Sequence, residues 1–146
     1  MYINIGESLG QPQVLGRSSD YIRWVQRSLN LRGNCLQVNG LDSLGYRKAV
    51  QGFQKSVGGL TANGKVDART QDALILSNQR NPFYIDWVQT ALNHPKTNKL
   101  DSNAIRQFQE VAHFMDPNVK VDGVVGPKTE AAIVRLAFTQ PPGECV

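Results

Sequence analysis

The stretch VDGVVGPKTEAAI, residues 121–133, places two turn signals just before a helical pattern. Asp122-Gly123 is a turn dipeptide, because glycine adopts a positive φ without a Cβ clash. We expect Gly126 to form a second such bend, and one of the two valines between the bends to fill a core. The loop is therefore predicted to be a rigid connector that aims one helix against another.

The helix after this loop is expected to begin at Thr129, whose hydroxyl would cap the first-turn amides. Pro127 stiffens the approach to that helix, and Glu130 suits the positive end of its dipole. The spacing of Ala132 and Ile133 places both on its inner face.

This pattern is one of several that the chain repeats. YIRWVQRSLN at residues 21–30 returns as YIDWVQTALN at residues 84–93, with seven of ten positions identical. Two further pairs keep the same order: AVQGFQ (49–54) with AIRQFQ (104–109), and NGKVDARTQDALI (63–75) with DGVVGPKTEAAIV (122–134). The spacing within each pair differs only by loop-sized amounts, so we infer two copies of one unit.

The two copies are predicted to occupy residues 18–78 and 81–138. Residues 1–17 form a polar lead-in, and residues 139–146 form a tail that a Pro-Pro-Gly sequence keeps non-helical. Each copy reads as three helices. The predicted fold class is therefore all-α, as two tandem three-helix units with long ordered loops. A short joining segment favours their packing together.

Apolar residues three and four positions apart define the helices of the first copy. We expect Asp20 to cap its first helix and Gly33 to end it. The second helix is predicted at about residues 46–57, and the third begins near Thr70. The inner faces are predicted to carry Ile22, Val25, Leu29, Val50, Phe53, Val57 and Leu74.

The second copy has clearer boundary signals. Asn81-Pro82 combines a capping residue with a proline at the first helical position. Asp101 or Ser102 is expected to cap the next helix, and Asp116 to end it. The inner faces of these two helices are predicted to carry Ile85, Val88, Leu92, Ile105, Phe108, Ala112 and Met115.

The composition narrows the classes of partner that the protein is expected to bind. A net charge of +4 favours an acidic partner, but no Lys/Arg cluster is dense enough to indicate nucleic acid. No apolar run reaches the roughly 18–20 residues that a membrane span needs. The N-terminal sequence lacks the pattern of a secretory signal, which leaves the export route open. The sequence also leaves open whether Cys35 and Cys145 form a disulfide or stay free.

The series WVQxxLN, AVxxFQ and (D/N)-G-x-V, followed by T-x-x-A, resembles the peptidoglycan-binding domain family of small three-helix modules. The resemblance covers about 115 of the 146 residues, as two tandem modules. It implies a protein that acts at the cell wall, in the periplasm or outside the cell, and that binds peptidoglycan through shallow polar grooves. The implied ligand-binding residues lie at the D/N-G loops: Asn39, Gly40, Asn63, Gly64, Arg69, Asp122, Gly123, Gly126, Lys128 and Thr129.

The copies depart from the family pattern in different loops. In the first copy, the loop NGLDSLGY at residues 39–46 has a serine and a tyrosine where glycine and threonine are usual. Its later loop has Asp67-Ala68 in place of Gly-Pro. In the second copy, the earlier loop is shortened to HPKTNKLDS at residues 94–102 and lacks Asp-Gly, whereas residues 121–129 match fully. The second copy therefore either binds through a remodelled groove or is purely structural.

Catalytic chemistry is not expected. The only histidines, His94 and His113, lack the spacing of a zinc site, although a set of His94, Cys35 and an aspartate is conceivable. Glu130 would sit in a first helical turn, where the dipole disfavours a general acid. We predict no enzyme activity, no cofactor and no metal.

Two sets of matched residues have both a structural and a binding interpretation. Matched glutamines recur at Gln26, Gln54, Gln89 and Gln109. We favour the interpretation that each braces a loop through its backbone, rather than binding a ligand. Trp24 and Trp87 also match, and packing is favoured over stacking on a sugar.

The leading hypothesis is a non-catalytic peptidoglycan-binding protein or targeting subunit, because stem peptides carry carboxylates that suit a basic protein. Two modules would add avidity. A separate cell-wall hydrolase is a further expected partner; nucleic acid and membrane insertion are not. The alternative is a protein–protein adaptor of a phage or secretion apparatus, which a large exposed apolar patch would favour. A pro-segment or inhibitor is a weaker third hypothesis.

Overall fold

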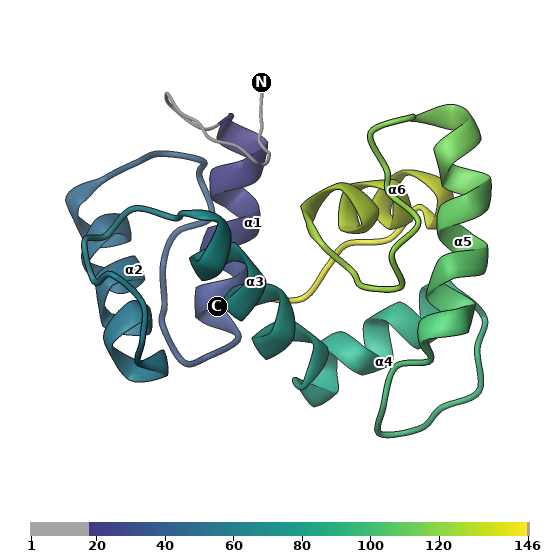
Figure 1. Cartoon of the computed structure of the whole chain (residues 1–146), viewed down its shortest axis with the longest axis horizontal. Coiled ribbons are helices and arrows are strands. Elements are labelled where there is room, and N and C mark those ends of the chain that lie inside the picture. Colours follow the sequence, from purple (N-terminus) through teal and green to yellow (C-terminus); the bar gives the residue numbers. More distant parts are fainter. Residues whose placement is uncertain (1–17, 146) are drawn as a thin grey trace. The chain divides into compact units, whose positions relative to one another are not determined.

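The computed structural model describes residues 18–145, so the predicted lead-in at residues 1–17 lies outside the described part. That part contains helices and no β-strand, which confirms the all-α prediction (Figure 1). The helices are α1 (Ser19–Asn30), α2 (Leu44–Val57), α3 (Ala68–Gln79), α4 (Pro82–Ala91), α5 (Ser102–Met115) and α6 (Pro127–Ala137). None of them is long and apolar enough to cross a bilayer.

The chain divides into two compact units. The first unit runs to Ser77 and also takes in the chain from Gly143 onward; the second runs from Asn78 to Pro142. The first unit therefore holds α1, α2 and most of α3, and the second holds α4, α5 and α6.

The core of the first unit forms where the apolar faces of its helices meet. Its buried members are Ile22, Trp24, Val25, Leu29, Tyr46, Val50, Phe53, Val66 and Leu74. The prediction for Val57 was wrong, since its side chain is 46% exposed. Val57 is the last residue of α2 and precedes Gly58 at φ +79°, where the chain turns away from the helix axis.

Serine side chains cap the first two helices. Ser18 Oγ accepts the backbone N–H of Tyr21, so the cap of α1 is Ser18 and not Asp20, which lies in the first helical turn. Ser43 caps α2 in the same way, and that helix begins at Leu44, two residues before the predicted position. A serine hydroxyl at the capping position satisfies an amide that the helix itself leaves unpaired.

In the second unit, Asn81 caps α4 and Asp101 caps α5, as predicted. The buried apolar residues are Tyr84, Ile85, Trp87, Val88, Ile105, Ala112, Val119, Val125, Ala132 and Ile133. The prediction for Met115 was wrong: this last residue of α5 is 66% exposed.

The loop between α5 and α6 keeps one predicted bend and loses the other. Gly123 has φ +78°, but Gly126 is extended and is itself the N-cap of α6. The helix therefore begins at Pro127, before Thr129, because proline at the first helical position has the required φ and no N–H that needs a partner. Val125 is the valine that fills the core, with no exposed surface.

The C-terminal segment is attached to the first unit. Cys35 and Cys145 form a disulfide with a Cα–Cα distance of 5.1 Å. Asn30 Nδ2 also donates to the carbonyl of Gly143 at 2.8 Å. The thiol of Cys35 is therefore not available to a metal site with His94.

Candidate functional site

The loop from Asp122 to Thr129 is held by one buried side chain, Gln109 on α5. Its Oε1 accepts the backbone N–H groups of Asp122 and Gly123 at 3.0 and 2.9 Å. Its Nε2 donates to Asp122 Oδ1, to the carbonyl of Val124 and to Thr129 Oγ1, at 2.9 to 3.0 Å. Every polar atom of this amide is therefore used inside the protein.

Gln54 on α2 holds the loop before α3 by the same chemistry. Its Oε1 accepts the N–H of Gly64 at 2.9 Å. Its Nε2 donates to the carbonyl of Lys65 at 2.8 Å and to Thr70 Oγ1 at 3.0 Å. Thr70 thus occupies the position in this loop that Thr129 occupies in the other.

The remaining two glutamines brace the loops that follow α1 and α4. Gln26 Oε1 accepts the N–H groups of Asn39 and Gly40 at 3.1 and 3.0 Å. Gln89 Nε2 donates to Thr97 Oγ1 at 2.9 Å, and its Oε1 accepts the N–H of Thr97 at 3.2 Å. The predicted bracing role of the four glutamines is confirmed.

We refer to residues 39–41, 63–70, 97–99 and 122–129 as the glutamine-braced loops. The predicted binding residues lie in three of them. Gly40, Gly64, Gly123 and Thr129 are buried, while Asn39 and Gly126 are half-buried and Asn63 and Asp122 are exposed. Because the buried amides are already bonded, a ligand can reach these loops only through their exposed edges.

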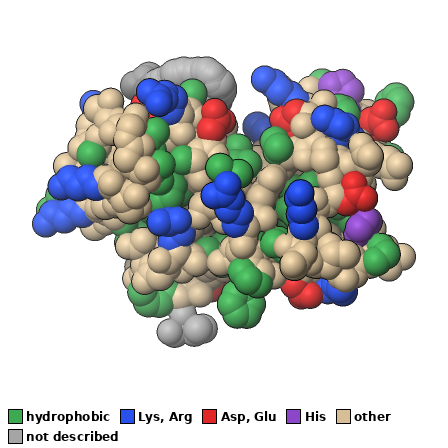
Figure 2. All heavy atoms as spheres, turned by 60° about the horizontal axis from the view of Figure 1, so that its bottom comes forward, with side chains coloured by type: hydrophobic (Ala, Val, Ile, Leu, Met, Phe, Trp, Pro, Cys, Tyr) green, Lys and Arg blue, Asp and Glu red, His purple; other side chains and the backbone are tan. Residues whose placement is uncertain are grey.

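The exposed edges carry unpaired cations. Arg69 follows the 63–67 turn, and Lys128 lies in the first turn of α6. Both side chains are exposed, and neither has a hydrogen bond or ion pair within the described residues. Figure 2 shows Lys and Arg side chains spread over the visible face rather than gathered into one dense cluster.

The matched tryptophans are packing residues. Trp24 is 2% exposed and Trp87 is 9% exposed. Trp87 Nε1 donates to Thr139 Oγ1 at 3.1 Å, which fixes the chain that follows α6. Neither ring presents a face on which a sugar could stack, so the packing interpretation is confirmed.

The buried glutamate and the two histidines of the described residues each have a partner within the protein. Glu130 is buried and accepts the Tyr84 hydroxyl at 2.7 Å. His94 lies between the Pro95 carbonyl and the Asp101 carboxylate. Within residues 18–145, no three His, Cys, Asp or Glu side chains gather as a metal site.

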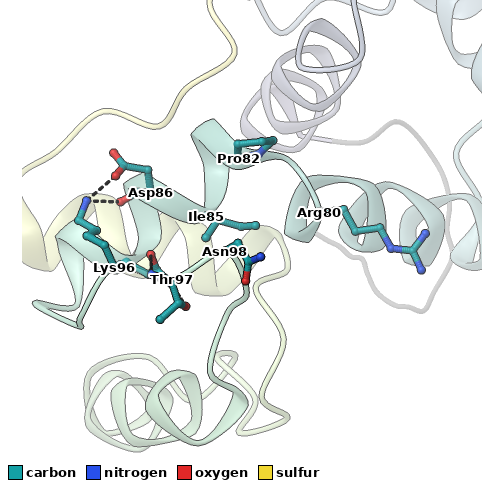
Figure 3. Close-up of a pocket in the computed structure, with 8 residues that line it drawn as sticks. Arg80, Pro82, Ile85, Asp86, Lys96, Thr97 and Asn98 are labelled. Carbon is teal, nitrogen blue, oxygen red and sulfur yellow. Dashed lines mark hydrogen bonds and ion pairs between the residues drawn. The ribbon is translucent and has the colours of Figure 1, made fainter.

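A groove of about 370 Å³ lies beside α4 in the second unit (Figure 3). We call it the α4 groove. It is lined by Arg80, Pro82, Ile85, Asp86, Gln89, Lys96, Thr97 and Asn98. None of these residues was predicted as a site from the sequence. The one signal was the shortened, polar 94–102 loop, whose departure from the family pattern indicated a remodelled groove.

Some polar side chains of the α4 groove have hydrogen-bond partners and others do not. The Lys96 ammonium donates to Asp86 Oδ1, to the Asp86 carbonyl and to Thr90 Oγ1. By contrast, the side chains of Arg80 and Asn98 have no hydrogen-bond partner within the described part of the chain. Figure 3 shows the Arg80 side chain extended away from the Asp86–Lys96 pair.

Comparison with known protein families gives a match for part of the second unit. Residues 103–144 match the family described as "Predicted Peptidoglycan domain". The match contains Gln109, the 122–129 loop and α6, and it supports peptidoglycan as a partner and a general role in cell-wall binding. No curated protein and no solved structure matches the chain.

Proposed function

We propose that this protein is a non-catalytic peptidoglycan-binding protein that contacts the wall through the exposed edges of its glutamine-braced loops. The observation that carries the proposal is the coincidence of the family match with the best-braced loop. Residues 103–144 include both Gln109 and every loop atom that it bonds. The ligand side of that loop would be Asp122 and Lys128, with Gly123 and Gly126 setting its shape.

The proposal extends to the first unit as a second copy of the same module. Gln54 bonds Gly64 and Thr70 as Gln109 bonds Gly123 and Thr129. The ligand side of the first unit would be Arg69 with Asn63 and Asn39. Two weak sites on one chain would gain avidity on a polymer that repeats its ligand.

The charges fit this target. Stem-peptide carboxylates would meet a protein of net charge +4, with unpaired Arg69 and Lys128 at the loop edges. Exposed ion pairs of this kind are individually weak and are screened by salt. Binding is therefore expected to depend on salt and on several contacts acting together.

The test is co-sedimentation of the full chain with insoluble peptidoglycan sacculi at low and high salt. We expect Lys128→Ala and Arg69→Ala each to lower the bound fraction, and the pair together to lower it further. Lys55→Ala removes the same charge from an exposed α2 residue that is not part of these loops, and should bind like the parent. If the parent protein does not co-sediment with sacculi of any of several wall types, that result would falsify the proposal.

A second candidate function is a protein–protein adaptor of a phage or secretion apparatus. Its support is the exposed apolar end of α5, where Val111, Phe114 and Met115 are 60%, 91% and 66% exposed. Residues three and four positions apart on a helix share one face. If sacculi fail to bind, site-specific photocrosslinking from position 114 in extracts of the source cells would test this alternative.

A further inference from the structure

We propose that the α4 groove is a second ligand site of the second unit, and that its ligand is a short peptide with free carboxylates. The site lies outside residues 103–144, and it includes Thr97 and Asn98 of the 97–99 loop, for which the sequence predicted no binding residue. This inference rests on the proposed function, because it names stem-peptide-like chemistry for a separate part of the same protein.

Internal hydrogen bonds hold the walls of the groove in place. Gln89 bonds both the backbone and the side chain of Thr97, which fixes the loop that carries Asn98. Lys96 ties the same loop to α4 through Asp86 and Thr90. A ligand therefore does not have to order this loop, and preorganisation of this kind favours binding.

The unpaired groups of the groove are those that recognise a peptide. Arg80 offers guanidinium N–H groups, which bind a carboxylate in a bidentate geometry. Asn98 has both a donor and acceptors, as a peptide bond requires of its partner. The Arg80 side chain is exposed and unpartnered within the described residues, so no internal contact has to be broken when a ligand carboxylate pairs with its guanidinium.

The rest of the lining sets the size and polarity of the ligand. Pro82 and Ile85 give an apolar surface next to the polar wall. The volume of about 370 Å³ lies at the small end of the range for ligand pockets, which suits a dipeptide rather than a glycan chain. The Lys96 ammonium already has three oxygen partners, so we assign the carboxylate to Arg80.

The experiment is an amide NMR titration of the full chain with the dipeptide alanyl-glutamate. We expect saturable shifts at Ile85 and Asn98, with a Kd on the order of 1 mM for a ligand of this size. The analogue alanyl-glutamine amide, which lacks both carboxylates, should bind at least about tenfold more weakly, since a charge-assisted hydrogen bond is lost. Equal shifts from both peptides would overturn the carboxylate assignment.

Variants separate the groove from the rest of the surface. Arg80→Gln should weaken dipeptide binding by about tenfold, with Arg80→Lys in between. Lys120→Gln removes the same charge from an exposed residue outside the groove and outside the glutamine-braced loops, and should leave the titration unchanged. Unchanged Gly123 resonances in Arg80→Gln show that the fold is intact. Shifts confined to the 122–129 loop, or no shifts at all, would overturn the inference.

Sacculus binding separates this inference from the proposed function. A chain that binds sacculi but shows no dipeptide shifts at the groove retains the proposed function and loses the second site. A chain that binds the dipeptide through Arg80 but never binds sacculi keeps the groove as a peptide site and loses the wall-binding function.

Discussion

Gln109 Oε1 accepts the backbone N–H of Gly123 at 2.9 Å, and this bond fixes the one positive-φ residue of the 122–129 loop against α5. The bond is part of a set in which one fully buried amide satisfies two backbone donors, one carbonyl and two side-chain oxygens. The loop thus depends on a single side chain for its shape.

Gln109→Ala is expected to destabilise the second unit by about 3 kcal/mol, because it removes the acceptor of two loop amides, of which that of Gly123 is buried. Urea unfolding followed by circular dichroism measures the loss. Gln107→Ala is the matched control, since Gln107 is exposed two residues earlier on α5. Equal unfolding midpoints for the two variants would show that the brace contributes little.

Two glycine-to-alanine changes should have opposite signs. At Gly123, with φ +78°, a Cβ would lie 2.5 Å from Ser102 Oγ, so alanine should cost about 2 kcal/mol. At Gly52, inside α2, a Cβ would meet nothing within 4 Å, and alanine should stabilise by about 0.8 kcal/mol through helix propensity. Thermal and urea unfolding of both variants measure the two changes in stability. A shift in the same direction for both variants would contradict the prediction.

Loss of the disulfide should lower stability by about 4–5 kcal/mol, the chain-entropy estimate for a closed loop of roughly this length. The bond joins residues separated by 110 positions. Urea unfolding with and without a phosphine reductant measures the effect. A Cys35→Ser/Cys145→Ser variant should match the reduced protein and should not respond to the reductant. A parent protein whose unfolding midpoint ignores the reductant would contradict the prediction.

Asp101 should make the stability of α5 decrease at acidic pH. Its carboxylate accepts the N–H groups of Asn103 and Ala104, and these bonds lower the pKa of Asp101, with a smaller contribution from His94. A lowered folded-state pKa means that the stabilisation is complete above the ordinary aspartate value of about 3.9 and is lost as the pH falls through the lower folded value.

An NMR titration of the Asp101 carboxyl carbon checks that direction. Asp101→Asn keeps a good capping side chain but cannot titrate, so its stability should change less between pH 5 and pH 2 than that of the parent. A midpoint for Asp101 at or above the ordinary aspartate value would show that the cap does not favour the charged form.

Most of the helices could be predicted because their apolar spacing and their caps are local signals. Asn81-Pro82 marks the start of α4 within two adjacent residues. Thr129 was misassigned as a cap because threonine is a good capping residue in isolation. In the fold its hydroxyl is taken by Gln109, twenty positions earlier, and Gly126-Pro127 starts the helix instead. Such competition depends on tertiary contacts that local patterns do not contain.

The candidate site was less predictable than the helices. The recurrence of Gln26, Gln54, Gln89 and Gln109 was visible in the sequence, and so was their bracing role. The α4 groove was not, because it depends on how the 94–102 loop folds back beside α4. The pairing of Cys35 with Cys145 could not be predicted from the sequence either, because it requires the C-terminal tail to return to the first unit.

The disulfide also changes what a protease can do to this protein. Cys35 and Cys145 are separated by 110 of the 146 positions, and the span between them includes the segments that leave and re-enter the first unit at residues 77–78 and 142–143. A single backbone cut anywhere inside that span yields two polypeptides that are still joined by one covalent bond. The nicked molecule stays in one piece until the sulfur–sulfur bond is reduced, so no single cleavage in the span can detach either fragment from the other.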